Sequence, residues 1–464
     1  MSVEKAPDTT IETLRYWNER GRALVRCGRH EEALECYDRA LTVRCDFPQI
    51  WANRGNALRY LDRLNEAEES LRQALRLKPH FANAYNNLGS VLLDLNRLEE
   101  ADSSFRAAIH LEPGNPGFHK NLASVCMRAG RAAEAHGHYR AALCLNPDDA
   151  EIHEDLGMAL LLSGNFREGW AEYEWRWRTR RAAAEVRRFP LPAWCGETIS
   201  DKTVLVHAEQ GLGDTLQFCR LASHVPARDI ILEVQPPLVR LLSTLSGPRM
   251  VIARGERLPP HDLHCSLMSL PYALGTTLDT IPAEIPYLRA DPRDVEHWRR
   301  RLADLPGLRV GLCWAGGRSP TNREQNRIDD RRSLHLTVLA PLVAVEGISF
   351  VSLQTGEPAA QATHPPAGMN VRDFASALHD FADTAALVEC LDLVISVDTA
   401  TPHLAGALGK PVWLMSRADT CFRWLQDRDD SPWYPTMRLF RQPAPGDWDS
   451  VTSRVRDALR HLPA

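Results

Sequence analysis

Two turns in the second half of the chain carry residues suited to binding an anion and to moving a proton. The first begins at His207 and contains Gly211 and Gly213, where the backbone can approach a ligand closely, and then Asp214. A carboxylate at this place can take a proton from a hydroxyl group, or it can cap the following helix. Leu216 stands where a dinucleotide fingerprint has its third glycine, and no Gly-Lys-Ser/Thr of a Walker loop follows.

The second turn follows a buried apolar strand that ends at Asp398. Thr399 or Thr401 can cap the next helix, and Pro402 suits its first turn. The free N–H groups and hydroxyls at such a helix start form an anion site that fits a diphosphate. His403 either donates to that anion or is simply a polar residue of the first helical turn, and we expect the former.

These turns belong to an alternation of short apolar runs and amphipathic stretches, which begins at about Leu191 and is typical of an α/β fold. A charged segment at 291–308 is expected to join two lobes, and a last helix is expected at 449–461. Ligands of such folds bind beyond the carboxyl ends of the strands, so both turns should face a cleft between the lobes. The expected strands are Thr203–His207, Ile230–Gln235, Met250–Ala253, Arg309–Trp314, Ser349–Gln354, Asn370–Phe374, Leu393–Val397 and Val412–Met415.

The first third of the chain repeats every 34 residues. Small residues recur at this spacing at Gly21, Gly55, Gly89, Ala123 and Gly157. Aromatic or leucine side chains recur 16 residues later, which favours pairs of helices that cross at a small residue. The pattern resembles the tetratricopeptide repeat and predicts about five stacked units forming a superhelix with a concave groove. The last unit is irregular, and its tryptophans at 170, 175 and 177 are expected to dock on the next domain.

Three asparagines share one place in the first helix of consecutive units: Asn53, Asn87 and Asn121. A carboxamide both donates and accepts hydrogen bonds, so this row is suited to clamp an extended peptide backbone. The alternative is that asparagine is common at this place in such repeats whatever they bind.

Composition excludes several classes of protein. The 464 residues include 55 Lys+Arg and 60 Asp+Glu, a net charge of −5 that gives no support for a nucleic-acid binder. The 11 cysteines form no CxxC pair and no zinc-like spacing, so we expect reduced thiols and no metal. No apolar window reaches the ~18 residues of a membrane span, and the start is unlike a signal peptide. A cytoplasmic protein is therefore expected.

The second part of the chain resembles the heptosyltransferase-like, two-lobed (GT-B) bacterial glycosyltransferases, here fused to tetratricopeptide repeats. The resemblance covers about 191–462 and rests on the segments 209–214, 396–411 and 430–435. It implies that Asp214 is the general base, and that no metal or cofactor is needed beyond a nucleotide-sugar donor. It implies that the donor is bound by Gly211, Gly213, Arg332, Gln354, Asp398, Thr399 and His403, with Glu357 near the nucleotide. Trp424, Trp433 and Tyr434 either stack on the base or, as we expect, pack at the lobe interface.

We therefore expect an α + α/β chain: a tail at 1–13, repeats at 14–183, a short N-terminal lobe at 184–305 and a nucleotide-sugar-binding lobe at 306–464. Because the N-terminal lobe is short, the repeats are candidates to supply part of the acceptor site. The expected function is an inverting transfer of a sugar to a Ser or Thr hydroxyl of a protein held in the groove, for example a surface or flagellar protein. The alternatives are a non-catalytic scaffold, a transferase with a lipid or polysaccharide acceptor, and a sugar-nucleotide epimerase.

Overall fold

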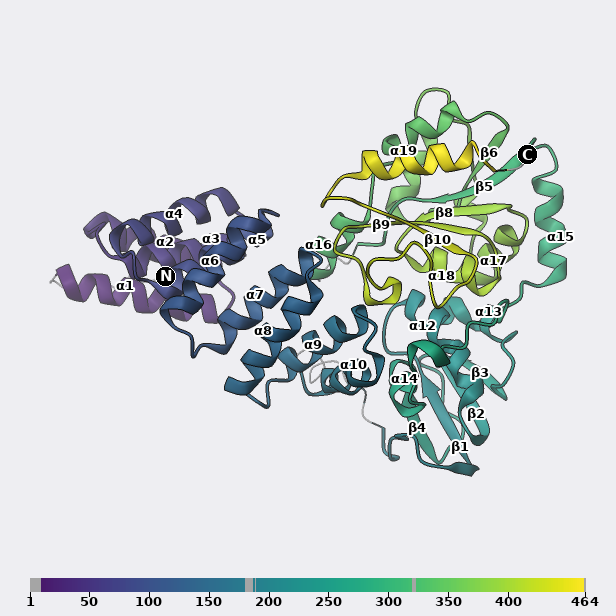
Figure 1. Ribbon diagram of the computed structural model, residues 1–464, viewed down its shortest axis with the longest axis horizontal. Helices are drawn as coiled ribbons and strands as arrows, with labels where there is room; N and C mark the ends of the chain where they lie inside the picture. The colour runs from purple at the N-terminus through teal and green to yellow at the C-terminus, as the bar shows by residue number, and fades with distance from the viewer. Residues whose placement is uncertain (1–9, 180–186, 188, 319–322, 463–464) are drawn as a thin grey trace. The chain divides into compact units, whose positions relative to one another are not determined.

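The computed structural model describes residues 10–179, 187, 189–318 and 323–462 (Figure 1). The chain divides into two compact units, one ending at Ala159 and the other beginning at Leu160. The division falls inside helix α9 (Ala150–Leu162), upstream of residue 183, where we expected the repeats to end. None of the described helices is both long and apolar enough to cross a membrane.

The first unit consists of helices that pair along the sequence, each pair joined by a short turn. Four such pairs are followed by α9, which is the first helix of the fifth repeat. The four pairs are α1 (Thr10–Arg26) with α2 (His30–Val43), α3 (Pro48–Tyr60) with α4 (Leu64–Leu77), α5 (Ala82–Asp94) with α6 (Leu98–Leu111), and α7 (Pro116–Arg128) with α8 (Ala132–Leu145).

The two helices of a pair cross where the repeat places a glycine, as the sequence predicts. A Cβ atom added to Gly21 would lie 2.6 Å from the ring of Tyr37, and one added to Gly89 would lie 2.8 Å from the ring of Phe105. Real Cβ contacts are never this short, so the glycine lets the large side chain of the second helix fill the crossing. Tyr37 and Phe105 are both buried, and they form the centre of their repeats.

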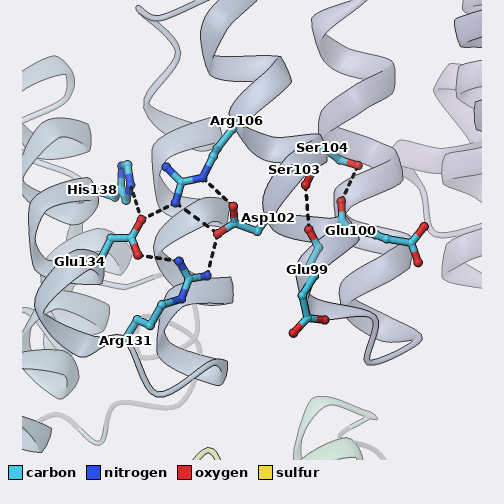
Figure 2. A network of polar contacts seen from close by, with 9 residues as sticks. All are labelled: Glu99, Glu100, Asp102, Ser103, Ser104, Arg106, Arg131, Glu134 and His138. Atoms are coloured by element: carbon cyan, nitrogen blue, oxygen red, sulfur yellow. Dashed lines mark hydrogen bonds and ion pairs between the residues drawn. The ribbon is translucent and has the colours of Figure 1, made fainter.

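A ladder of ion pairs joins the second helices of successive repeats (Figure 2). Arg131, directly before α8, donates to Glu134 in that helix and to Asp102 in the preceding repeat, both at 2.6 Å. Arg106 in turn pairs with Asp102 in its own helix and with Glu134 in the next repeat. The same pattern recurs one repeat earlier, where Arg97 bridges Glu100 and Glu68. The ladder therefore ties α4, α6 and α8 together.

Three possible metal ligands, Cys126, Glu134 and His138, also meet at this ladder. The carboxylate of Glu134, however, is held by the guanidinium groups of Arg106 and Arg131. Two positive charges at the carboxylate oppose a bound cation. We therefore assign Glu134 to the ladder and not to a metal site.

The second unit contains two sheets in which all the described strand pairs are parallel. The first sheet has the order β3-β2-β1-β4 and the second has the order β10-β9-β8-β5-β6-β7. The strands of the first are β1 (Ile199–His207), β2 (Ala227–Val234), β3 (Met250–Ala253) and β4 (Leu263–Ser266). Those of the second are β5 (Leu308–Cys313), β6 (Ile348–Ser352), β7 (Val371–Asp373), β8 (Leu393–Val397), β9 (Val412–Ser416) and β10 (Met437–Arg441).

Both sheets have a topological switch point. In the second sheet the chain proceeds outward from β5 to β7 and then returns to β8 on the other side of β5, which is the doubly wound order. In the first sheet the chain likewise proceeds from β1 to β3 and returns to β4 beside β1. Ligands of open α/β sheets bind at these points, at the carboxyl ends of the strands.

Helices and short turns cover the sheets. The N-terminal lobe has α12 (Leu212–Phe218), α13 (Val239–Leu242) and α14 (Leu270–Ala273), and α15 (Pro292–Arg301) leads to the second sheet. The C-terminal lobe has α16 (Arg323–Arg332), α17 (Phe381–Glu389), α18 (Ala400–Ala407) and α19 (Trp448–Leu459). In the core, α19 packs its buried Val451, Val455 and Leu459 with residues of β5, β6 and β8 (Figure 1).

Two strands, β4 and β10, are absent from the prediction. β4 is only four residues long and contains His264, so no apolar run marks it, yet it pairs with β1 on one side and bridges to Ala193 on the other. β10 carries two arginines, Arg438 and Arg441, in five residues and lies at the edge of its sheet, where Arg438 stays exposed. In both strands, pairing with a neighbour and not local hydrophobicity determines the structure.

Helix α10 (Phe166–Tyr173), the second helix of the fifth repeat, belongs to the second unit. Its Trp170 is buried and makes edge-on ring contacts with Phe218 of α12 and Phe422 of the C-terminal lobe. Its Phe166 stacks on Trp433. The prediction that Trp170 docks on the following domain is confirmed, and α10 contacts both lobes.

Asp102→Asn is expected to lower the free energy of unfolding by about 1–3 kcal/mol, because two guanidinium groups lose their charged acceptor. Urea unfolding of the full chain, followed by far-ultraviolet circular dichroism, measures the change. The exposed pair of Arg44 with Asp46 supplies the control, and Asp46→Asn should leave the stability unchanged. Equal effects of the two substitutions would contradict a structural role of the ladder.

The effect of Asp102→Asn should also depend on pH. Burial raises the pKa of Asp102, but hydrogen bonds from Arg106 and Arg131 outweigh this and lower it. A carboxyl group with a lowered folded pKa stabilises the protein above its unfolded pKa of ~3.9. That stabilisation is lost as the pH falls through the folded pKa, so the difference between wild type and variant should shrink in acid.

Candidate functional site

A cavity of ≈ 910 Å³ lies at the carboxyl ends of both sheets in the second unit. It is bordered by the turns after β1 and β8, by Glu233 near the end of β2, and by residues after β3, β5, β6 and β9. All eight site residues that we expected in this half of the chain line it, whereas Glu357 does not. The eight are Gly211, Gly213, Asp214, Arg332, Gln354, Asp398, Thr399 and His403.

The two predicted turns meet directly. A Cβ atom added to Gly213 would lie 3.0 Å from the ring of His403 and 3.4 Å from the Cα atom of Ala400. The starts of α12 and α18 are therefore in contact, and glycine at 213 is needed for this approach. Because helix starts carry partial positive charge, their convergence favours an anion in the cavity.

Asp214 is held at the start of α12. Its Oδ2 atom accepts a hydrogen bond from the Gly211 N–H at 3.0 Å, and its Oδ1 atom forms an ion pair with Arg423. Burial alone would lower the pKa of Arg423, but the charge of Asp214 outweighs burial and raises it. Arg423 follows β9 in the other lobe, so this ion pair connects the two lobes inside the cavity.

His403 is buried and stacks on the ring of Trp424. Burial lowers the pKa of His403 well below its usual value, and the charges of Arg423, Arg220 and Arg332 add to this effect. The ring is therefore neutral at pH 7. Its Nδ1 atom lies 3.1 Å from the Tyr434 hydroxyl. When that hydroxyl donates to Nδ1, the ring proton is on Nε2, and the ring can donate to an anion.

Tyr434 is itself held by a buried network. Its hydroxyl lies 3.4 Å from that of Tyr287, which donates to the Leu216 carbonyl and accepts from Arg220, both at 2.7 Å. Trp424, Trp433 and Tyr434 are each fully buried. Trp433 and Tyr434 contact Phe218 and Tyr287 of the N-terminal lobe, as expected, whereas the rings of His403 and Tyr434 that Trp424 meets belong to its own lobe. None of the three lines the cavity.

Arginines dominate the charge of the cavity. Six arginines line it, against the four carboxylates Glu209, Asp214, Glu233 and Asp398. Among the described residues, the Nε atom of Arg332 and the Nη1 atom of Arg417 are buried without a hydrogen-bond partner. Arg332 pairs with Asp329, and Arg417 lies 3.4 Å from Asp419. Unused guanidinium N–H groups in a partly enclosed cavity favour binding of a phosphate or carboxylate.

Gln354 has a structural role in the wall of the cavity. Its Oε1 atom accepts from the backbone N–H groups of Trp314 and Ala315, and its Nε2 atom donates to the carbonyls of Ala315 and Thr355. The amide is therefore used within the protein and shapes the turn after β5. Our expectation that it contacts the donor is not supported by this geometry.

Asp398 and Thr399 stand at the start of α18. The Thr399 side chain caps the helix by accepting from the Thr401 N–H at 3.4 Å. No hydrogen bond or ion pair of the Asp398 carboxylate is found within the described parts of the chain, and its side chain is partly exposed. Asp398 is thus the one cavity carboxylate that is not paired with an arginine there.

The end of the fifth repeat forms part of the cavity wall. Arg176, Trp177 and Thr179, which follow α10, all line it. Tyr173 of α10 accepts a hydrogen bond from Gln210 in the glycine-rich turn at 2.7 Å. The sequence suggested that the repeats supply part of an acceptor site, and this short segment is the part that reaches the cavity.

The three asparagines of the repeats lie in the first unit. Asn53 donates to Asn18 and Asn121 donates to Asn86, each at 2.8 Å. These bonds link neighbouring repeats. Asn87 has the same place, but Ala52 stands where its partner would be. Its half-buried amide forms no hydrogen bond with another described residue, so Asn87 is the best placed of the three to bind a peptide.

Arg423, Arg417 and Glu209 are site residues that sequence reasoning missed. A signal was available for Arg417, since it follows a predicted strand at the carboxyl edge of its sheet. Arg423 is found only through its contact with Asp214, 209 residues earlier in the chain.

Arg423→Gln is expected to lower the free energy of unfolding by up to about 3 kcal/mol, because Asp214 keeps a charge without its partner. Asp214→Asn combined with Arg423→Gln should recover part of this loss. Arg438→Gln, which removes a positive charge from exposed β10, is the control. Thermal unfolding of the wild type, the single variants Asp214→Asn and Arg423→Gln, the double variant and the control measures the coupling. Additive losses in the double variant would contradict a direct interaction.

Family models of the tetratricopeptide repeat match two parts of the chain, at 52–116 and 120–174, and a further repeat model matches 21–59. Among curated proteins, the chain is similar to Protein FlbA of Caulobacter vibrioides, with 28% identity over 324 residues. The match covers 64% of the chain and 53% of FlbA, so the chain spans about half the length of that relative.

Two solved structures illustrate the likeness of the helical part. A thermophilic repeat protein of Thermus thermophilus is 23% identical, with a TM-score of 0.34 over 36% of this chain and 92% of its own. YrrB, described as having an unusual peptide-binding site, is 17% identical, with a TM-score of 0.31 over 38% and 93%. The matches of the family models identify the N-terminal region of this chain as an array of tetratricopeptide repeats.

Proposed function

We propose that the second unit is a glycosyltransferase of the two-lobed GT-B type, which moves a sugar from a nucleotide-sugar donor to a Ser or Thr hydroxyl of a protein recruited by the repeats. The observation that carries the proposal is the convergence of two switch-point turns on one cationic cavity. Each turn comes from a separate parallel sheet, and the two touch at Gly213 and His403.

The donor fits the side of the cavity formed by the second sheet. The start of α18 offers N–H groups for a diphosphate, and neutral His403 adds a donor when its proton is on Nε2. Arg332 and Arg417 have unused N–H groups there. Together these groups would hold the diphosphate and stabilise the charge that develops on it as it leaves.

Three of the four cavity carboxylates are poorly suited to a divalent cation, and the fourth, Asp398, would be a single carboxylate ligand. Glu209 and Asp214 each pair with an arginine, and Glu233 accepts two bonds from Arg187. Mg²⁺ prefers carboxylates that are free to coordinate it. We therefore propose that the arginines and the helix start perform the task that a metal performs elsewhere, and that displacement at the anomeric carbon is direct and inverts its configuration.

The acceptor is proposed to be a protein because the transferase carries a repeat array. Arrays of this kind offer an extended concave surface, and the amide of Asn87 is available on a first helix. The segment Arg176–Thr179 then connects the end of the array to the cavity. A lipid or polysaccharide acceptor would not require such a surface.

The first test measures thermal stabilisation of the full chain by a panel of nucleoside diphosphates and their sugars. A ligand at 100 times its Kd adds ~2.7 kcal/mol to the folded state, so one nucleotide class should raise the unfolding temperature. Arg417→Gln should reduce this shift, because it removes unused donors from the cavity. Arg460→Gln, outside the cavity, should not. If no member of the panel shifts the folded wild type, the transferase proposal fails.

The second test concerns the acceptor. With the donor class identified, a labelled sugar is offered to a library of Ser- and Thr-containing peptides, to free oligosaccharides and to lipid extracts. We expect label on peptides, and we expect Asn87→Ala to raise KM for the best peptide without lowering kcat. Asn83→Ala, at an exposed place on the same helix, is the matched control. Label only on oligosaccharide or lipid would overturn the protein acceptor.

A further inference from the structure

The carboxylate that the resemblance assigns as general base, Asp214, has both oxygens engaged. One forms an ion pair with Arg423, and the other accepts the Gly211 N–H. Neither oxygen is free to receive a hydroxyl proton unless one of these contacts breaks. This geometry suits a residue that fixes Arg423 beside the donor better than it suits a base.

A second carboxylate, Glu209, occurs on the same turn. It lies two residues after β1, at the switch point of the first sheet, and lines the cavity. Its Oε1 atom is 3.4 Å from Arg176, and its Oε2 atom is buried with no partner at good hydrogen-bond geometry among the described residues, with the Ser266 hydroxyl as its polar neighbour. A buried carboxylate oxygen with poor hydrogen bonding is costly, and a catalytic role is one reason for a protein to keep such a group.

We propose that Glu209 accepts the proton of the acceptor hydroxyl and that Asp214 is a positioning residue that holds Arg423. This assignment rests on the proposed glycosyltransferase function. The acceptor oxygen forms a bond to the anomeric carbon, while the bond between that carbon and the phosphate oxygen breaks. The electron pair of the broken bond leaves with the nucleoside diphosphate, and the hydroxyl proton moves to Glu209.

The surroundings of Glu209 suit this role. Burial raises the pKa of Glu209, although the charge of Arg176, the Ser266 hydroxyl and the Glu209 backbone N–H oppose the shift. A carboxylate with a raised pKa is a stronger base, and general bases work best when their pKa is near the working pH. Arg176 comes from the segment after α10, so the end of the repeat array adjusts the charge around the proposed base.

Glu174 provides a matched control. It pairs with the same guanidinium of Arg176, at 2.5 Å, and accepts from Ser269, but it does not line the cavity. Glu174→Gln therefore removes a carboxylate from Arg176 without removing the proposed base. Glu209→Gln removes the base and keeps the size of the side chain.

The experiment uses the full chain, the sugar nucleotide that stabilises it most, and water as the acceptor. The release of nucleoside diphosphate is measured at saturating donor between pH 4 and pH 9, a range of ~5 units around the working pH. Donor Kd is measured separately by calorimetry for wild type, Glu209→Gln, Asp214→Asn and Glu174→Gln. Circular dichroism confirms that each variant is folded.

We expect Glu209→Gln to lower kcat by ~10²–10⁴-fold, the range for loss of a general base, with donor Kd nearly unchanged. As the pH is lowered, the wild-type rate of nucleotide release should decrease, and this decrease should begin at a pH above the ordinary pKa range of glutamate. The residual rate of Glu209→Gln should not show this decrease. Asp214→Asn should mainly weaken donor binding, and its rate should still decrease at low pH. Glu174→Gln should behave like wild type.

Wild-type kcat in folded Glu209→Gln would overturn the assignment while leaving the transferase intact. If Asp214→Asn lowers kcat at unchanged donor Kd, and if its rate no longer decreases at low pH, Asp214 is the general base. An equal loss in Glu174→Gln would show that only the charge of Arg176 matters. If the wild type binds no nucleotide or releases none from a donor, the proposed function fails, and this assignment fails with it.

Discussion

The second unit depends on a buried arginine that has no carboxylate partner in the described structure. Arg220 donates to the carbonyls of Gln217, Pro282 and Trp433 and to the Tyr287 hydroxyl. Its guanidinium also lies over the rings of Tyr287 and Tyr434. Neutral acceptors and aromatic faces thus solvate a full charge at the lobe interface. Because Tyr434 is part of this arrangement and meets His403, the interface and the cavity share one set of contacts.

Local patterns in the sequence predicted the repeat and the two turns, because each has a short-range physical signature. The 34-residue spacing of Gly21, Gly55 and Gly89 follows from helices that cross closely, and the residues around Asp214 and Asp398 mark strand-to-helix turns. The strands β4 and β10 and the partner of Asp214 were not predictable in this way. They depend on contacts between residues far apart in the chain, and one sequence without homologues gives no information about such pairs.

The roles of the site residues were harder to predict than their positions. Gln354, Asp214 and His403 all line the cavity, but the amide of Gln354 is used by backbone groups and Asp214 is used by Arg423. Residue type shows what a side chain can do, whereas hydrogen-bond partners show how much of that capacity is already used. A prediction from type alone therefore overestimates the number of groups that are available to a ligand.

Helix α10 is a repeat helix by sequence and a member of the second unit by packing. Its Phe166, Trp170 and Tyr173 contact both lobes and the glycine-rich turn. The described residues that line the cavity all follow α10, and none belongs to the four helix pairs before α9. Over evolutionary time, the array could therefore gain, lose or exchange whole repeats upstream of α9 and acquire new protein partners, while the aromatic side chains of α10 keep their contacts with the two lobes unchanged.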